Sequence, residues 1–275
     1  MKRSQLILIA IGVIAIAGLY VLPTVVVDNE SKADGISQEN SSSSTQSTDP
    51  VAMHEAELST DQRLQLNTLK LQIAENSSKE EVKSSTEEIA AIYQELGKYD
   101  SAGYYLSLTA DKQSDMELAE KAGNAYYEAF SFALDPEKVT YTAEQTRKYL
   151  NKVLENDPTR LDLKTKVAMT YVSSSNPMQG ITMMREILEE DPQNEDGLFN
   201  MGVLSMQSGQ YKRATERFEE LIQYHPDNLQ GQFYLGVSYF EAKQNNKAKA
   251  QFEKVKTMTK DEMILGSIES YLEKL

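Results

Sequence analysis

Residues 202–226 read GVLSMQSGQYKRATERFEELIQYHP, and residues 236–260 read GVSYFEAKQNNKAKAQFEKVKTMTK. The two stretches place a glycine, an alanine and a phenylalanine at the same offsets, 34 positions apart. The residues that recur with this spacing are Gly202 and Gly236, Ala214 and Ala248, Phe218 and Phe252, and the prolines Pro158, Pro192 and Pro226. A repeat of this length predicts a stack of similar small units rather than one globular core.

The order of small residue, small residue, aromatic residue and proline within 34 positions resembles the tetratricopeptide repeat. The resemblance implies an all-α fold, a right-handed α-solenoid built from pairs of helices. We expect five pairs, at about residues 83–115, 116–160, 161–194, 195–228 and 229–262. A cap helix is predicted at 261–275 and a further amphipathic helix within 52–75, so the repeat domain covers 52–275.

Small residues are expected where the two helices of a pair cross, because they let the backbones approach closely. Ala90 with Tyr93, and Gly123 with Tyr126, fit the same template in two earlier first helices. From Gly123 to Ala168 there are 45 residues, 11 more than the period, and we assign the excess to an inserted loop at 134–142. Before the first repeat, Ser78 and Glu81 have the spacing of a capping box, which predicts a helix start.

The first 27 residues predict a membrane anchor. Residues 6–27 form an uncharged apolar run that follows Lys2 and Arg3. Such a run is long enough to cross a bilayer, and the basic residues place the N-terminus in the cytoplasm. We therefore expect a single-pass protein of a bacterial inner (cytoplasmic) membrane, with the C-terminal domain periplasmic or otherwise extracytoplasmic.

A cleaved signal peptide is the alternative for the same segment, because Ala15-Ile16-Ala17 has the small-x-small pattern of a cleavage site. Either interpretation exports the rest of the chain. Residues 28–51 are rich in serine and poor in apolar residues, which predicts a disordered linker.

The composition excludes several functional classes. A formal net charge of −14 without a basic stripe opposes binding to phosphate backbones, so no nucleic-acid partner is expected. The absence of cysteine excludes disulfides, thiolate metal sites and cysteine nucleophiles. His225 is interpreted as a solvated residue at a helix end, and His54 has no recognisable nucleophile to act on. We therefore predict no catalytic residue, no metal site and no cofactor, and a protein that is not an enzyme.

The resemblance also implies a place for a ligand, because in tetratricopeptide folds the first helices line a concave groove that holds peptides. Residues at i, i+4 and i+7 share one face of a helix, which identifies the candidate groove positions. These are Glu120, Tyr127, Met169, Val172, Phe199, Val203, Met206, Phe233, Val237 and Phe240, and Asn200 is added because it fits one ligand position of a carboxylate clamp known in the family.

The N-terminal part of this groove is acidic and the C-terminal part is apolar. The pattern predicts a bound protein or peptide segment with apolar anchors, helped by basic residues opposite Glu87, Glu117 and Glu120. A clamp for a C-terminal carboxylate, which one branch of this family carries, is not expected because Thr165 and Met169 occupy the positions of its Lys and Asn.

Internal packing is the competing interpretation of the groove aromatics, against one another or against the C-terminal helix. If Phe199 and Phe233 were both fully buried, the groove hypothesis would fall. The predicted function is a non-enzymatic, membrane-anchored scaffold or adaptor that binds a protein partner, in cell-envelope assembly. The alternatives are a scaffold that self-associates into a homo-oligomer, through the apolar half of the groove or the 134–142 loop, and an accessory subunit of an envelope or cytochrome-maturation complex.

Overall fold

The computed structural model describes residues 58–75 and 78–275. The predicted anchor at 1–27, the predicted linker at 28–51 and the residues from 52 to 57 lie outside the described residues. Within the two described ranges, no helix combines the length and the apolar character needed to cross a bilayer.

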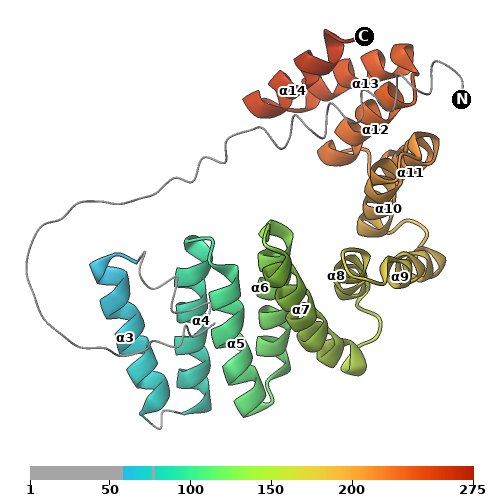
Figure 1. Cartoon of the computed structure of the whole chain (residues 1–275). Helices are drawn as coiled ribbons and strands as arrows, with labels where there is room; N and C mark the ends of the chain where they lie inside the picture. The colour runs from blue at the N-terminus through green and yellow to red at the C-terminus, as the bar shows by residue number, and fades with distance from the viewer. Residues whose placement is uncertain (1–57, 76–77) are drawn as a thin grey trace, which may run out of the picture. The chain divides into compact units, whose positions relative to one another are not determined.

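Every regular element in these ranges is an α-helix, and each helix contacts the next one along the chain (Figure 1). The all-α prediction is therefore confirmed. The first helices of the five pairs are α4 (Lys79–Glu95), α6 (Met116–Phe132), α8 (Leu161–Val172), α10 (Glu195–Gln207) and α12 (Leu229–Glu241). The second helices are α5 (Tyr99–Gln113), α7 (Pro136–Asn156), α9 (Pro177–Glu190), α11 (Tyr211–Tyr224) and α13 (Asn245–Met258). Flanking these pairs are α3 (Thr60–Ala74) and α14 (Glu262–Leu272).

Side-chain caps set the starts of several helices. The Ser78 N–H donates to Glu81 Oε2 at 2.8 Å and the Glu81 N–H donates to Ser78 Oγ at 3.3 Å, so the predicted capping box is confirmed. Two asparagines 34 residues apart, Asn194 and Asn228, cap α10 and α12 in the same way, each accepting from a backbone N–H three residues on. These caps satisfy amide groups that would otherwise have no partner at the helix ends.

The small residues of the first helices lie against aromatic rings of the second helices. A Cβ atom added to Gly202 would lie 2.6 Å from Cζ of Phe218, and one added to Gly236 would lie 2.7 Å from Cε1 of Phe252. Both rings are fully buried. The close approach predicted at the helix crossings is therefore present in consecutive pairs.

The segment predicted as an inserted loop at 134–142 is helical from Pro136 onward, so this prediction is wrong. Asp135 caps the N-terminus of α7 by accepting from the N–H groups of Glu137 and Lys138. Proline is well suited to the first position of a helix because the N–H that it lacks has no partner there. Lys138 then forms a 2.7 Å ion pair with Asp100, a carboxylate that is 3% exposed on α5. The additional residues lengthen the second helix of this pair rather than the turn before it.

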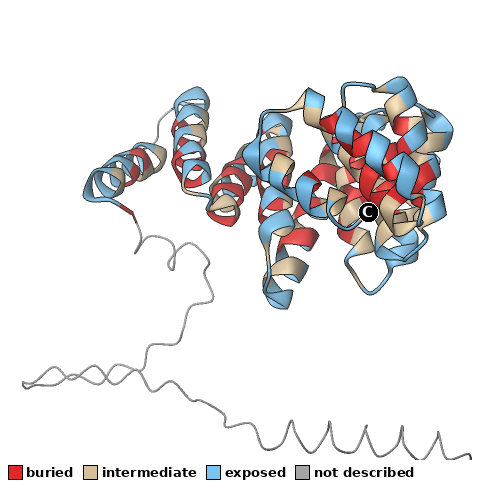
Figure 2. Cartoon of the chain, turned by 90° about the horizontal axis from the view of Figure 1, so that it is seen from above, coloured by how far each residue is buried: buried red, intermediate tan, exposed pale blue. Residues whose placement is uncertain are grey.

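Residues that are buried lie on the sides of the helices that face neighbouring helices (Figure 2). Among the described residues they form one cluster over α3 to α8, another over α10 to α14, and a small cluster of Ala168, Met184 and Ile187 at α8 and α9. The small cluster lies where α8 and α9 cross, and Gly180 of α9 faces the backbone of α8 at this crossing. A Cβ atom on Gly180 would lie 2.3 Å from the carbonyl oxygen of Ala168.

We predict that Gly180→Ala lowers the free energy of unfolding by about 1–3 kcal/mol, because the added methyl group meets backbone atoms that cannot rotate away. The matched control is Gly266→Ala in α14, where nothing lies within 4 Å of the added Cβ. The control is expected to raise stability by up to about 1 kcal/mol, since alanine favours a helix interior over glycine. Urea unfolding followed by circular dichroism measures both. Equal effects at the two positions would contradict this account of the α8–α9 crossing.

Candidate functional site

The first helices of neighbouring pairs contact one another, α6 with α8, α8 with α10 and α10 with α12. We call the surface formed by their predicted groove positions the first-helix surface. Val237 is 6% exposed, so it belongs to the buried core beneath this surface and does not line the surface. The other predicted groove residues are half-buried: Glu120, Tyr127, Met169, Val172, Phe199, Asn200, Val203, Met206, Phe233 and Phe240.

Phe199 and Phe233 each pack against rings of this chain on one side. The centroid of Phe199 lies 6.0 Å from that of Phe218 and 5.6 Å from that of Tyr234. Phe233 lies 5.8 Å from Tyr234 and 6.3 Å from Tyr271 of α14. Neither Phe199 nor Phe233 is fully buried. Internal packing covers part of each ring. Because both rings keep some exposed area, the groove hypothesis stands.

The C-terminal helix covers the end of the first-helix surface. Tyr271 of α14 lies 5.2 Å from Phe240 and stacks on Phe252 at 5.2 Å, while Ile268 of the same helix is fully buried. Because Tyr271 of α14 packs on the rings of α12, we take the apolar residues of α8 and α10 as the part of the first-helix surface open to a ligand.

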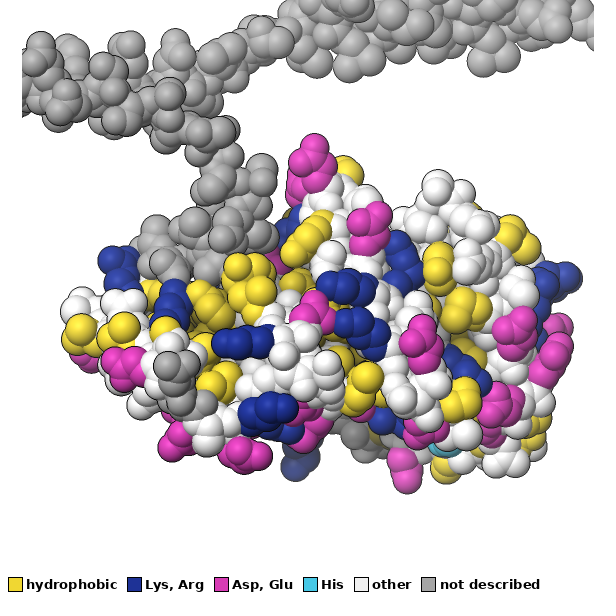
Figure 3. Space-filling view, turned by 90° about the horizontal axis from the view of Figure 1, so that it is seen from below, with side chains coloured by type: hydrophobic (Ala, Val, Ile, Leu, Met, Phe, Trp, Pro, Cys, Tyr) yellow, Lys and Arg dark blue, Asp and Glu magenta, His cyan; other side chains and the backbone are white. Residues whose placement is uncertain are grey.

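Ion pairs within the chain occupy the acidic end of this surface. Lys121 Nζ lies 2.6 Å from Glu87 Oε1 and 2.7 Å from Glu117 Oε1, and Lys83 Nζ lies 2.6 Å from Glu117 Oε2. Hydrogen bonds from Lys121 and Lys83 lower the pKa of Glu117 to about 2. Basic and acidic side chains also lie next to one another across the face of the molecule drawn in Figure 3.

The middle of the surface is similarly paired. Two N–H groups of Arg160 donate to the carboxylate of Glu120, at 2.7 and 3.1 Å. Lys166 donates to Asn124 Oδ1 at 2.6 Å and lies 5.7 Å from the ring centroid of Tyr127. The expectation that a partner supplies basic residues opposite Glu87, Glu117 and Glu120 is therefore revised, because cations of this chain already hold those carboxylates.

A hollow with a volume of ≈ 370 Å³ remains between α4 and α6 despite the ion pairs. Its lining mixes polar and apolar groups: Glu87, Ala90, Gln94, Leu106, Lys121 and Asn124. The Glu87–Lys121 pair lies at its wall, so a ligand here would meet a neutralised rather than an acidic surface.

Asp196 is a carboxylate on this surface that the sequence pattern did not single out. It lies one turn before Asn200 on α10, whose side-chain amide donates to the Asp196 backbone oxygen at 2.8 Å. Asp196 is an exposed residue, but the protein atoms around its carboxyl, with a smaller contribution from the neighbouring Glu195, raise its pKa, although Lys166 opposes the shift. Among the described residues, no hydrogen bond or ion pair engages this carboxylate. Its position on the same face as Phe199 and Val203 was the available signal in the sequence.

The repeat geometry is similar to that of known proteins in both sequence pattern and structure. Residues 205–262 match the family model described as tetratricopeptide repeat. A tetratricopeptide repeat protein from Parabacteroides merdae superposes with a TM-score of 0.56 at 17% identity, over 82% of this chain and 85% of that one. A thermophilic TPR protein of Thermus thermophilus gives a TM-score of 0.51 at 13% identity, over 69% of this chain and 98% of that one. No curated protein sequence matches the chain.

The fold is that of a tetratricopeptide repeat protein. Within the described residues of this repeat array, no three His, Cys, Asp or Glu side chains are grouped as a metal site would need. His225 ends α11, where its Nε2 lies 2.7 Å from the backbone oxygen of Gln193 and its Nδ1 lies 3.6 Å from Glu195. These contacts connect the turns that end two successive repeats, so His225 has a structural role. His54 lies outside the described residues.

The Glu117 ion pairs of the repeat array make a testable pH prediction. Because the pKa of Glu117 is lowered from 4.5 to about 2 in the folded chain, its pairs stabilise the fold at neutral pH, and this contribution is lost as the pH falls through that interval. An NMR titration of the Glu117 carboxyl carbon is expected to show a midpoint near 2, which rises towards 4.5 in Lys121→Gln. Lys112→Gln on the exposed side of α5 is the control and leaves the midpoint unchanged. A midpoint near 4.5 in the unaltered chain would show that the pairs do not persist in solution.

Proposed function

We propose that the protein is a non-enzymatic scaffold or adaptor that binds a segment of another protein along the first-helix surface. The observation that carries the proposal is the half-buried apolar row on α8 and α10, which lies next to the Asp196 carboxylate. Apolar anchors with a polar group beside them are typical of surfaces that bind extended or helical segments. The tetratricopeptide fold supports the same class of function.

The chemistry of the surface defines the partner segment. Met169, Phe199, Val203 and Met206 offer apolar side chains with part of their area still accessible to solvent. Methionine side chains adapt to ligands of different shape because they are flexible and unbranched. Asp196 favours a lysine or arginine beside the apolar anchors, since a cation would offset the cost of removing water from the carboxylate. The segment is therefore expected to carry apolar residues with one basic residue next to them.

We also propose that residues 6–27 anchor the protein in the inner membrane, with the repeat array on the extracytoplasmic side. The support is the uncharged apolar run and the basic residues Lys2 and Arg3 before it. An adaptor tethered in this way would recruit its partner to the membrane surface, which fits a role in envelope assembly or as an accessory subunit of an envelope complex.

Self-association is the second candidate function, and two exposed side chains favour it. Phe132 is 68% exposed and Leu134 is 97% exposed, at the turn between α6 and α7. Neighbouring apolar side chains with this exposure are suited to contact another molecule. A second copy would bury them without any need for the first-helix surface.

Photoreactive amino acids at Met206 and, in a second variant, at Leu134 distinguish the two candidates in the full-length, membrane-extracted protein. Adaptor function predicts a crosslink to a different protein from Met206 and none from the exposed Lys249 on α13, whereas a crosslink from Leu134 to a second copy supports self-association. Asp196→Lys is expected to lower the affinity for the captured protein about tenfold, which corresponds to about 1.4 kcal/mol. The matched control, Asp227→Lys in an exposed turn, leaves it unchanged. Equal capture from Met206 and Lys249, or no effect of Asp196→Lys, would contradict the proposed surface.

A further inference from the structure

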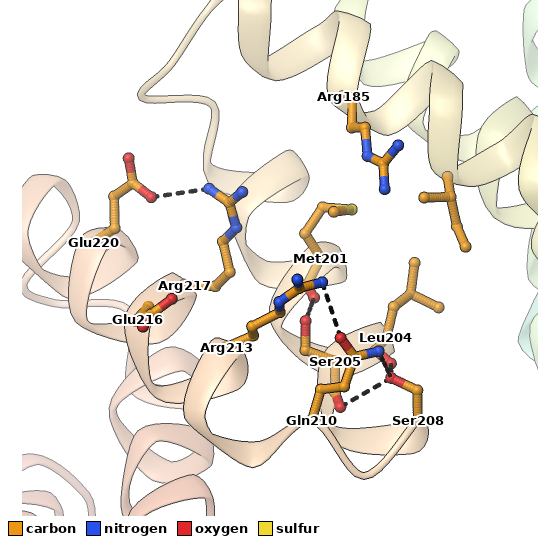
Figure 4. A pocket seen from close by; sticks show the side chains of 11 residues that line it. Arg185, Met201, Leu204, Ser205, Ser208, Gln210, Arg213, Glu216, Arg217 and Glu220 are labelled. Carbon is orange, nitrogen blue, oxygen red and sulfur yellow. Dashed lines mark hydrogen bonds and ion pairs between the residues drawn. The ribbon is translucent and has the colours of Figure 1, made fainter.

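A pocket of ≈ 390 Å³ lies on the opposite side of α10 from the first-helix surface. A helix turns by about 100° per residue, so positions 201, 204, 205 and 208 point away from positions 199, 203 and 206. The pocket lies between α9 and α11 over this back face of α10. Its lining includes Arg185 of α9, Met201, Leu204 and Ser205 of α10, and Arg213 and Arg217 of α11 (Figure 4).

The repeat register explains why the pocket is open at α10. In four of the five first helices a tyrosine follows three residues after the small residue at the helix crossing. These tyrosines are Tyr93, Tyr126, Tyr171 and Tyr239, and the residue at the same place in α10 is Ser205. The Ser205 hydroxyl donates to the Met201 backbone oxygen at 2.7 Å and fills none of the space that a ring would take.

The neighbouring repeats show what occupies this place when a tyrosine is present. In α12, the hydroxyl of Tyr239 donates to Glu219, and Lys247 lies 4.9 Å from the centre of its ring. In α8, the guanidinium of Arg147 lies 4.8 Å from the ring centre of Tyr171. In both repeats the ring is covered by a cation from a second helix, a favourable contact between a positive charge and the face of an aromatic ring.

The pair of α10 and α11 has a cation at the equivalent position of α11, but Ser205 replaces the tyrosine on α10. Counting 34 residues back, Arg213 takes the place of Lys247, and Arg185 takes the place of Glu219. Arg213 donates to the neutral amide of Gln210 at 2.9 Å, and among the described residues Arg185 has no hydrogen bond or ion pair. Figure 4 shows both guanidinium groups directed toward the same space.

We propose that this pocket, the arginine-rimmed pocket, binds an aromatic side chain of a partner protein that has carboxylates next to it. The ring would lie on Met201 and Leu204 under Arg213, as the chain's own tyrosines lie under cations in the adjacent repeats. A flanking carboxylate would pair with Arg185, which forms no ion pair with the described part of the chain. Arginine favours such carboxylates because its planar group can donate two parallel hydrogen bonds.

Size and charge both fit this ligand. An apolar cavity of about 150 Å³ is sufficient to bind benzene, so the pocket has room for a ring and part of its backbone. The lining also holds two carboxylates: Glu220 pairs with Arg217 of its own helix at 3.1 Å, and Glu216 offsets part of the charge of Arg185 and Arg213. Three arginines against two glutamates leave the lining with a net positive charge of one for the ligand. The N-terminal segment of this chain does not supply the ligand, because Tyr20 is the only Phe, Trp or Tyr residue before residue 58 and has no acidic residue within seven positions.

The test uses the full-length protein and two fluorescein-labelled peptides, Glu-Asp-Tyr-Glu-Asp and Glu-Asp-Ala-Glu-Asp, in a fluorescence anisotropy titration at physiological salt. The expected result is saturable binding of the tyrosine peptide, and at least tenfold weaker binding of the alanine peptide. Arg185→Gln and Arg213→Gln are each expected to weaken the tyrosine peptide at least fivefold, while Lys212→Gln on the same helix as Arg213 has no effect.

Ser205→Tyr provides the decisive variant, because it restores the residue that the neighbouring repeats carry. It is expected to abolish binding of the tyrosine peptide and to raise the melting temperature of the protein, as its own ring fills the pocket. Equal binding of the two peptides, no saturable binding of either, or undiminished binding by a folded Ser205→Tyr would overturn the proposal. The arginine variants keep the test valid if Ser205→Tyr does not fold.

Discussion

The contact between a small residue on one helix and a ring on the next sets the spacing of the C-terminal pairs. Gly202 admits the Phe218 ring, and Gly236 admits the Phe252 ring, at distances that no Cβ atom would permit. Because each second helix is drawn close in this way, its other face is left for the first helix of the next pair, as the contacts of α11 with α12 show. The rest of the repeat array depends on this alternation, since each helix is buried by helices of its own pair and of the adjacent pairs.

The same alternation gives α10 two different faces. One face of α10 contributes half-buried apolar side chains and Asp196 to the first-helix surface. The opposite face contributes Ser205 to the arginine-rimmed pocket. A scaffold with two such faces could hold one partner on the first-helix surface and contact a second through the pocket, without a change in its own fold. The ion pairs of Lys83 and Lys121 with Glu117 make the N-terminal part of the first-helix surface nearly neutral, which concentrates recognition on α8 and α10.

The 34-residue period was sufficient to predict the helical pairs, because the residues that set the close approach recur in the sequence itself. The error at 134–142 arose because the 11 residues beyond the period were assigned to a loop, whereas Asp135 followed by Pro136 starts the second helix there. The 34-residue spacing of Glu87 and Lys121 allowed their ion pair to be predicted. Which carboxylates Lys121 contacts depends on side-chain conformations that the sequence alone does not determine. The pocket behind Ser205 required the structure, since its size follows from the separation of α9 and α11.

Hydrogen exchange measured by mass spectrometry on Phe218→Ala tests the dependence on the small-residue and ring contact most directly. Removing a fully buried phenylalanine costs about 3–5 kcal/mol, and in an array of neighbour contacts the loss is local. The account predicts faster exchange in α10, α11 and α12, with protection in α4, α5 and α6 retained. An equal loss of protection in α4 to α6 would contradict it, because the array would then unfold as one globular core.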